Sequence, residues 1–176
     1  MRALADSDRI DAFIDRFGAA AAGLEGDVYL TGGATAVLIG WRDSTLDVDI
    51  KLIPDSDQLL REIPRLKQEL DLNIELASPI EFIPVPDGWQ ARSPFIRAVG
   101  ALRFHHFDPT AQALAKAERG HDSDRRDVQE MISRGLVNPA EAIAQFVSIE
   151  SQLYRFPAID PPTFRRSVIE LFHSGS

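Results

Sequence analysis

The sequence predicts an α+β protein, with a small mixed β-sheet flanked by helices and a helical C-terminal part. Up to residue 107, short segments with the period-two alternation of strands are interleaved with segments of helical periodicity. From residue 108 onward the strand patterns stop, and proline and glycine mark the starts and ends of successive helices. We therefore expect a sheet-containing core over residues 1–107 and a helical part over residues 108–176 that packs on it, with one single domain as the alternative.

The composition is that of an ordinary globular protein, because 44% of the 176 residues are hydrophobic and 26% are charged. The absence of cysteine excludes disulfides and thiolate metal ligands. No apolar run approaches the roughly 20 residues of a membrane span, and the N-terminus lacks the apolar centre of a signal peptide. We therefore expect a cytoplasmic protein without membrane contact. Since the net charge is −8, metal ions or a local basic patch must attract any phosphate-bearing ligand.

Helices and strands alternate at the N-terminal end of the chain. Residues 7–22 have apolar side chains at helical spacing, with Ser7 or Asp6 as the cap, which predicts an amphipathic helix. A short strand is expected over residues 27–30 and a short helix over residues 33–40, with the glycine pair Gly32-Gly33 between them.

The strongest strand pattern covers residues 46–53. Its apolar residues fall on one face, and its charged residues fall on the other. Asp47 and Asp49 therefore point the same way, roughly 7 Å apart along the strand. Two carboxylates on one face repel each other unless a cation lies between them, and Mg²⁺ prefers such oxygen ligands.

The middle of the chain combines one more helix with three further strands. Residues 56–70 predict a helix, although Pro64 is expected to kink or break it. Residues 72–76 alternate as a strand, and the prolines of residues 78–89 indicate loops and short turns. Residues 95–107 resemble a β-hairpin that turns at a glycine.

The last third of the chain reads as four helices. The first begins at Pro109 and ends at Gly120, and the second covers about residues 123–134. Pro139 and Pro161 mark the starts of the third and the last.

The glycine pair and the two aspartates together indicate phosphoryl chemistry. Glycine lets the backbone approach a ligand closely, and a following helix directs its N-terminal amides at a phosphate. Metal ions held by Asp47 and Asp49 could stabilise the entering and leaving oxygens of such a phosphate. A glycine pair alone is more often a tight turn, and an isolated Asp-x-Asp is common on solvated strands. The combination in this order is more specific.

The motifs Gly32-Gly33-Ala34-Thr35 and Arg42-x-x-Thr45-x-Asp47-x-Asp49 resemble the polymerase-β-like nucleotidyltransferase superfamily. Downstream, Lys116-x-x-Arg119-Gly120 followed by Asp124-x-x-Asp127 is similar to a motif of its abortive-infection (AbiEii-type) toxin-like branch. The resemblance covers about residues 27–135.

The resemblance implies a role for each matching residue. Gly32 and Gly33 would form the phosphate-binding turn, and Asp47 and Asp49 would bind the metal. Arg42 and Thr45 would belong to the same nucleotide-binding motif.

Further site residues lie on later segments. Glu75 is the candidate third acid, as metal ligand or as base, and stands where the superfamily commonly has aspartate. Lys116 would contact the nucleotide phosphates. Asp124 and Asp127 would orient that lysine or act as further active-site carboxylates. Ser123 stands where the branch often has lysine.

The sequence thus predicts a Mg²⁺- or Mn²⁺-dependent enzyme that transfers a nucleoside monophosphate from an NTP to an acceptor hydroxyl. The resemblance suggests a tRNA end or a protein as acceptor, and a toxin–antitoxin system with an antitoxin protein as partner. Two alternatives stay open: a weak or inactive NTP-binding module of such a pair, and a small-molecule, antibiotic-type nucleotidyltransferase.

Overall fold

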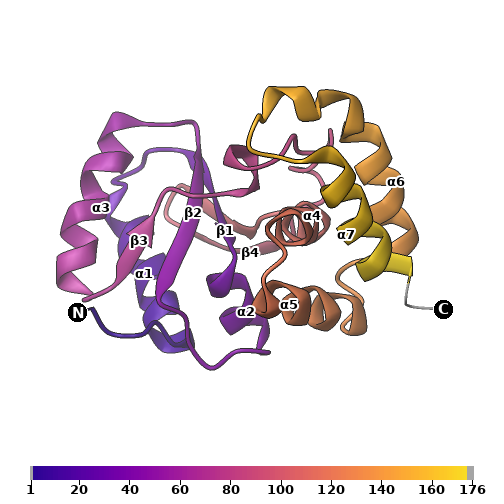
Figure 1. Cartoon of the computed structure of the whole chain (residues 1–176). Coiled ribbons are helices and arrows are strands. Elements are labelled where there is room, and N and C mark those ends of the chain that lie inside the picture. The colour runs from indigo at the N-terminus through magenta and orange to yellow at the C-terminus, as the bar shows by residue number, and fades with distance from the viewer. Residues whose placement is uncertain (1, 174–176) are drawn as a thin grey trace. The chain divides into compact units, whose positions relative to one another are not determined.

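The strands form one mixed five-stranded sheet in a computed structural model that describes residues 2–173 (Figure 1). The strand order is β3-β2-β1-β5-β4. In chain order the strands are β1 (Gly26–Thr31), β2 (Asp47–Ile53), β3 (Asn73–Glu75), β4 (Phe95–Val99) and β5 (Leu102–His106). The pairs β1–β2 and β4–β5 are antiparallel, whereas β1–β5 and β2–β3 are parallel. The predicted α+β class and its mixed sheet are confirmed.

Two compact units make up the chain, and each is defined by its own internal packing. The sheet unit comprises residues 1–78 and 93–107, and the helical unit comprises residues 79–92 and 108–176. The segment 79–92 therefore belongs with the C-terminal helices, although it precedes β4 in the chain.

Three helices cover one face of the sheet in the sheet unit. They are α1 (Ser7–Ala20), α2 (Gly33–Ile39) and α3 (Asp57–Glu69), and α1 and α3 lie side by side in Figure 1. Alternate residues of the strands point toward these helices and are buried, as the periodicity predicts. This core includes Phe13, Phe17, Val48, Ile50 and Phe104, each at most 1% exposed.

The predicted strand over 46–53 is wrong at its first residue. The strand begins at Asp47, and Leu46, expected on the buried face, is 64% exposed. Thr45 pairs instead with Ala5 in an isolated antiparallel bridge, which takes the chain out of the alternation before β2 begins.

Pro64 does not break α3, which runs from Asp57 to Glu69 as one helix. Proline removes one helical hydrogen bond, a cost of about 3 kcal/mol in an isolated helix. Here Ile63 and Leu66, on either side of the proline, are both buried in the core and hold the two halves in line.

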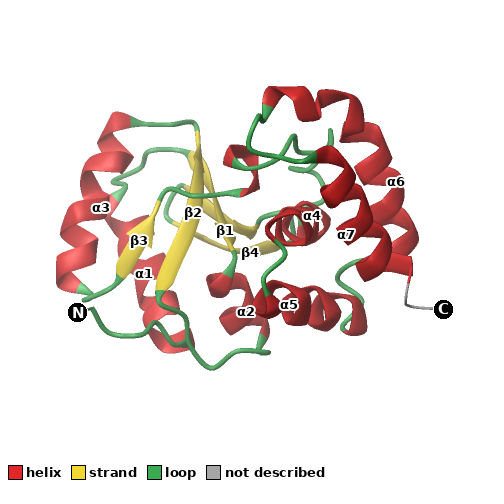
Figure 2. Cartoon of the chain, in the orientation of Figure 1, coloured by secondary structure: helices red, strands yellow, loops and turns green. Residues whose placement is uncertain are grey.

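The helical unit is built around α4 (Pro109–Arg119), which is seen end-on in Figure 2. It packs against α5 (Asp122–Ser133), α6 (Pro139–Ile149) and α7 (Pro161–His173). The 3₁₀ turns η1 (Pro79–Glu81) and η2 (Glu150–Arg155) complete the unit. Phe146 and Phe164 meet edge to face in its core, with ring centroids 4.8 Å apart. In residues 2–173, no helix is both long enough and apolar enough to cross a bilayer.

Candidate active site

Asp47 and Asp49 lie beside the glycine turn because β2 pairs antiparallel with β1. Asp49 is in register with Thr31, the last residue of β1, and Gly32 follows directly. Both aspartates are half-buried on one sheet face, which we call the carboxylate face. The intervening Val48 is fully buried on the helix-covered face, so the predicted alternation is confirmed.

Gly32 has a backbone conformation that requires glycine. Its φ of 63° and ψ of −129° lie in a region that residues with a Cβ rarely adopt. A Cβ at this position would also lie 3.0 Å from Oδ2 of Asp49. The backbone of the turn therefore approaches an aspartate of the candidate site directly.

Position 33 requires glycine for a different reason, because any side chain there would collide with Thr45. A Cβ at this position would lie 2.0 Å from Oγ1 of Thr45. Thr45 Oγ1 in turn donates a hydrogen bond to the carbonyl oxygen of Asp47 at 3.2 Å. Gly33 thus makes room for the side chain that fixes the first residue of β2. The helix α2 that begins here has only seven residues.

Asn73 is a site residue that our reading of the sequence missed. Because β3 pairs parallel with β2, Asn73 is in register with Asp47 and Glu75 with Asp49. The amide nitrogen Nδ2 of Asn73 donates to Oδ1 of Asp47 at 2.5 Å and to Oε1 of the exposed Glu75 at 2.9 Å. The alternation that placed Glu75 on the polar face also places Asn73 there, and that signal could have identified it.

The oxygen donors on the carboxylate face fit a hard divalent cation in their chemistry. Carboxylate oxygens are ligands that Mg²⁺ prefers, and Asp47 and Asp49 supply them, whereas Asn73 turns its amide nitrogen toward Asp47 and Glu75. Among residues 2–173, no three histidine, aspartate or glutamate side chains converge tightly enough to form a metal cluster. The hydrogen bonds of Asn73 hold Asp47 and Glu75 in their present positions, so an ion would have to compete with that amide.

Arg42 lies just after the end of α2. Its side chain is half-buried, and its backbone nitrogen donates to the carbonyl oxygen of Ala36 at 3.4 Å. The arginine therefore belongs to the segment that leads from the glycine turn into β2.

In the helical unit, Lys116 is brought together with both predicted aspartates. Its Nζ lies 2.8 Å from Oδ2 of Asp127 and 3.6 Å from Oδ1 of Asp124. All three side chains are at least nine-tenths buried. Gly120, with a φ of 72°, ends α4 and lets α5 begin so that its first turn faces the last turn of α4.

Asp124 has a second cationic partner and also caps α5. Arg119 donates two hydrogen bonds to its carboxylate, and the backbone nitrogen of His121 donates a third at 3.3 Å. Burial alone would raise the pKa of Asp124, but the hydrogen bond from Arg119 and the charge of Lys116 outweigh it and lower the pKa. Asp124 is therefore ionised at neutral pH.

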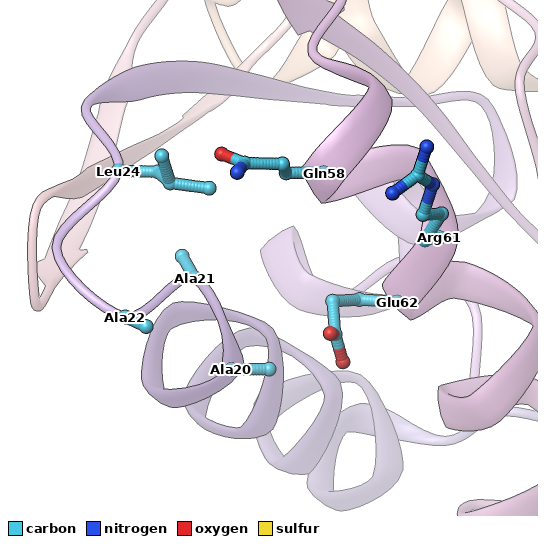
Figure 3. A pocket seen from close by; sticks show the side chains of 7 residues that line it. All are labelled: Ala20, Ala21, Ala22, Leu24, Gln58, Arg61 and Glu62. Atoms are coloured by element: carbon cyan, nitrogen blue, oxygen red, sulfur yellow. The ribbon is translucent and has the colours of Figure 1, made fainter.

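A hollow of about 390 Å³ lies elsewhere in the sheet unit, between the end of α1 and the start of α3 (Figure 3). Its walls are three alanines and Leu24 on one side and Gln58, Arg61 and Glu62 on the other. None of the residues that the sequence assigned to the site lines it.

Comparison with protein families decides what kind of protein carries these motifs. A family described as a nucleotidyltransferase of unknown function (DUF6036) matches residues 9–146. The chain belongs to this family. The matched range includes the glycine turn, the carboxylates of β2 and β3, and the Lys116 cluster of this nucleotidyltransferase. Neither a curated protein nor a solved structure gives a significant match.

Proposed function

We propose that this nucleotidyltransferase moves a nucleoside monophosphate from an NTP to an acceptor hydroxyl in a Mg²⁺- or Mn²⁺-dependent reaction. The observation that carries the proposal is the position of Asp47 and Asp49. They share one sheet face, and the Gly32 backbone lies against Asp49. Carboxylates beside a glycine backbone suit a metal-bound phosphate.

The residues of the carboxylate face have different proposed roles in the reaction. Asp47 and Asp49 would hold the ion, and the exposed Glu75 is the candidate base for the acceptor proton. When bound, the ion would supply positive charge that offsets the charge of the phosphate oxygens. The acceptor oxygen forms a bond to the α-phosphorus, the bond from that phosphorus to the bridging oxygen breaks, and pyrophosphate leaves. Gly32 lets the phosphate approach the backbone.

The toxin-like branch is the finer part of the proposal. It is supported by the Lys116 motif, because the lysine and its two aspartates form one buried cluster, as a shared role would require. The acceptors that the resemblance suggests are a tRNA end or a protein hydroxyl, and an antitoxin is the suggested partner.

A weaker NTP-binding module is the second candidate, and Asn73 favours it. This amide ties Glu75 to Asp47 by hydrogen bonds. A carboxylate that stays tied to Asn73 is a poorer base and a poorer metal ligand.

Label transfer tests the two candidates. The protein is incubated with each α-labelled NTP in turn, Mg²⁺, total RNA and cell extract. The enzyme is supported if the unsubstituted protein transfers label and the double variant Asp47→Asn/Asp49→Asn does not. The charge-matched control is Asp8→Asn/Asp57→Asn, two exposed aspartates of the sheet unit, and it should keep full transfer. Transfer by the site variant at the unsubstituted rate overturns the mechanism, and metal-dependent NTP binding without transfer identifies the module.

A further inference from the structure

We propose that Phe95 and His105 form a nucleobase subsite on the carboxylate face of the sheet. Phe95 stacks on the base, and Nδ1 of His105 accepts a hydrogen bond from the base's amino group. The ligand is an amino-bearing base, and we assign it to the NTP. That assignment rests on the proposed function, whereas the subsite itself does not.

The position of Asp27 fixes the tautomer of His105. Arg103 donates to both carboxylate oxygens of Asp27, from Nε at 2.9 Å and from Nη2 at 2.8 Å. These hydrogen bonds lower the pKa of Asp27 against the effect of its partial burial, so the carboxylate is ionised and can only accept. Nε2 of His105, 2.8 Å from Oδ1 of Asp27, must therefore carry the hydrogen.

The other ring nitrogen of His105 is left as an acceptor. In a neutral ring with its hydrogen on Nε2, Nδ1 presents a lone pair. It receives no hydrogen bond from the residues that the structure describes. Within that part of the chain, the one fully buried side-chain N or O atom without a partner is Oε1 of Gln145, so Nδ1 of His105 is not fully sealed, and the His105 side chain is 15% exposed.

A β-bulge brings Phe95 to the same face. β4 pairs antiparallel with β5, and the register shifts between Phe95 and Arg97. Phe95 lies opposite His105 on the carboxylate face, whereas Arg97 turns to the helix-covered face and binds Asp11 and Asp15 of α1. Without the extra residue, positions 95 and 97 would share a face. The bulge therefore re-aims an aromatic side chain toward His105.

Phe95 is placed to stack on a flat ligand. It is 61% exposed, and its ring stands edge-on to His105 with centroids 5.6 Å apart. Tyr29 supports His105 from another side as a parallel ring at 4.8 Å. An exposed aromatic ring beside a fixed acceptor suits a flat ring that carries an N–H donor. Single-stranded nucleotides are bound by this combination of stacking and edge hydrogen bonds.

The pairing of the strands sets the distance from the subsite to the aspartates. His105 is in register with Tyr29, and Asp49 is in register with Thr31, two residues further along β1. His105 and Asp49 are separated by two strand spacings across the sheet and by two residues along the strand direction. Their Cα atoms are therefore roughly 12 Å apart. Because both side chains project from one face, a nucleotide with its α-phosphate near Asp49 would extend its base toward His105, and Phe95 lies one strand beyond His105.

Titration with AMP, followed by NMR without metal, tests the subsite by itself. The second ligand is purine riboside monophosphate, which lacks the amino group. We expect Phe95→Ala to weaken AMP binding about tenfold, since stacking is worth about 1–3 kcal/mol per base. The matched control is Phe82→Ala, which removes a phenylalanine of the helical unit that is 56% exposed, and it should leave the affinity unchanged.

His105→Phe should abolish the preference for AMP over the analogue. Equal binding of the two ligands by the unsubstituted protein, or no effect of Phe95→Ala, overturns the subsite.

A second titration identifies the source of the base. With Mg²⁺ present, Phe95→Ala should weaken binding of ATP but not of inorganic triphosphate. Unchanged ATP affinity together with impaired transfer to RNA would overturn the assignment to the NTP and place the acceptor's base there instead. Failure of the proposed function gives a different pattern, because AMP would still bind while the unsubstituted protein transfers no label.

Discussion

Nδ2 of Asn73 lies 2.5 Å from Oδ1 of Asp47, so an amide of β3 holds the first aspartate of the Asp-x-Asp strand. The same nitrogen donates to Glu75 at 2.9 Å. Both bonds follow from the parallel register of β2 and β3, which sets Asn73 opposite Asp47. The amide places partial positive charge between Asp47 and Glu75, whereas the proposed ion would lie between Asp47 and Asp49.

Asn73→Asp should exchange this amide for a further carboxylate. Without metal, we expect the variant to be less stable by about 0.2–1 kcal/mol, because like charges on paired strands repel. With Mg²⁺ or Mn²⁺ it should gain more stability than the unsubstituted protein, since tighter binding to the folded state raises its apparent stability. Thermal unfolding with and without each ion measures both effects.

Asn73→Ser is the control, because it removes the amide and adds no charge. It should show no larger metal-induced rise in Tm than the unsubstituted protein. An equal metal response of the aspartate and serine variants would speak against an ion on this face.

Substitutions at the two glycines should fail for different reasons. Gly33→Ala drives a Cβ into Thr45 and should cost about 1–3 kcal/mol through overpacking. Adding Thr45→Gly should recover part of that loss, because the colliding atoms are gone. Gly32→Ala strains a backbone with a φ of 63°, so Thr45→Gly should not rescue it. Denaturant unfolding of the two double-mutant cycles checks this, and strictly additive losses at Gly33 and Thr45 would contradict it.

The local pattern of the sequence was sufficient to predict most helices and strands and the face of Asp47 and Asp49. It was insufficient where distant segments decide the outcome. Leu46 has the right period for the buried face, but the bridge between Thr45 and Ala5 removes it from the strand. Pro64 looks like a helix breaker, but burial of its neighbours keeps α3 continuous.

The candidate site shows the same limit. Alternation places Glu75 and Asn73 on the polar face, but only strand pairing reveals which aspartate each one meets. Similarly, Asp27 and His105 are 78 residues apart and meet because β1 and β5 pair in parallel. Periodicity describes one strand at a time, whereas register depends on the whole sheet.

Lys116 allows its structural and functional roles to be separated. Lys116→Met should cost about 3–5 kcal/mol, because it removes the cation that lies 2.8 Å from the buried carboxylate of Asp127. The double variant Lys116→Met/Asp127→Leu removes both members of the 2.8 Å pair and should be much closer to the unsubstituted protein in stability. Urea unfolding of both variants measures the difference. A double variant as unstable as the single one would contradict this account of the pair.

The folded double variant then tests the role that the resemblance gives to Lys116. If the lysine contacts nucleotide phosphates, the double variant should bind NTP more weakly in isothermal titration although it is folded. NTP affinity equal to that of the unsubstituted protein would restrict Lys116 to a structural role.

His106 should make folding stability depend on pH. Burial lowers the pKa of His106 to about 4, and its Nδ1 lies 3.1 Å from Oγ1 of Thr35. Since Thr35 Oγ1 donates its own hydrogen to the carbonyl oxygen of Leu30, the neutral histidine must donate to Thr35. These contacts join α2, β1 and β5 beneath the glycine turn, so protonation of this ring should loosen the support of the candidate site.

The sign follows from the two pKa values. In the unfolded chain the histidine has a pKa near 6.5, so on acidification the unfolded state binds the proton first. The stabilisation is complete above about pH 6.5 and is lost as the pH falls through 6.5 toward 4, by about 3 kcal/mol in all. His106→Asn keeps a donor for Thr35 and does not titrate. Urea unfolding between pH 7 and pH 4.5 should therefore show a steeper loss of stability for the unsubstituted protein than for the variant. Parallel curves would mean that folding does not lower the pKa of His106.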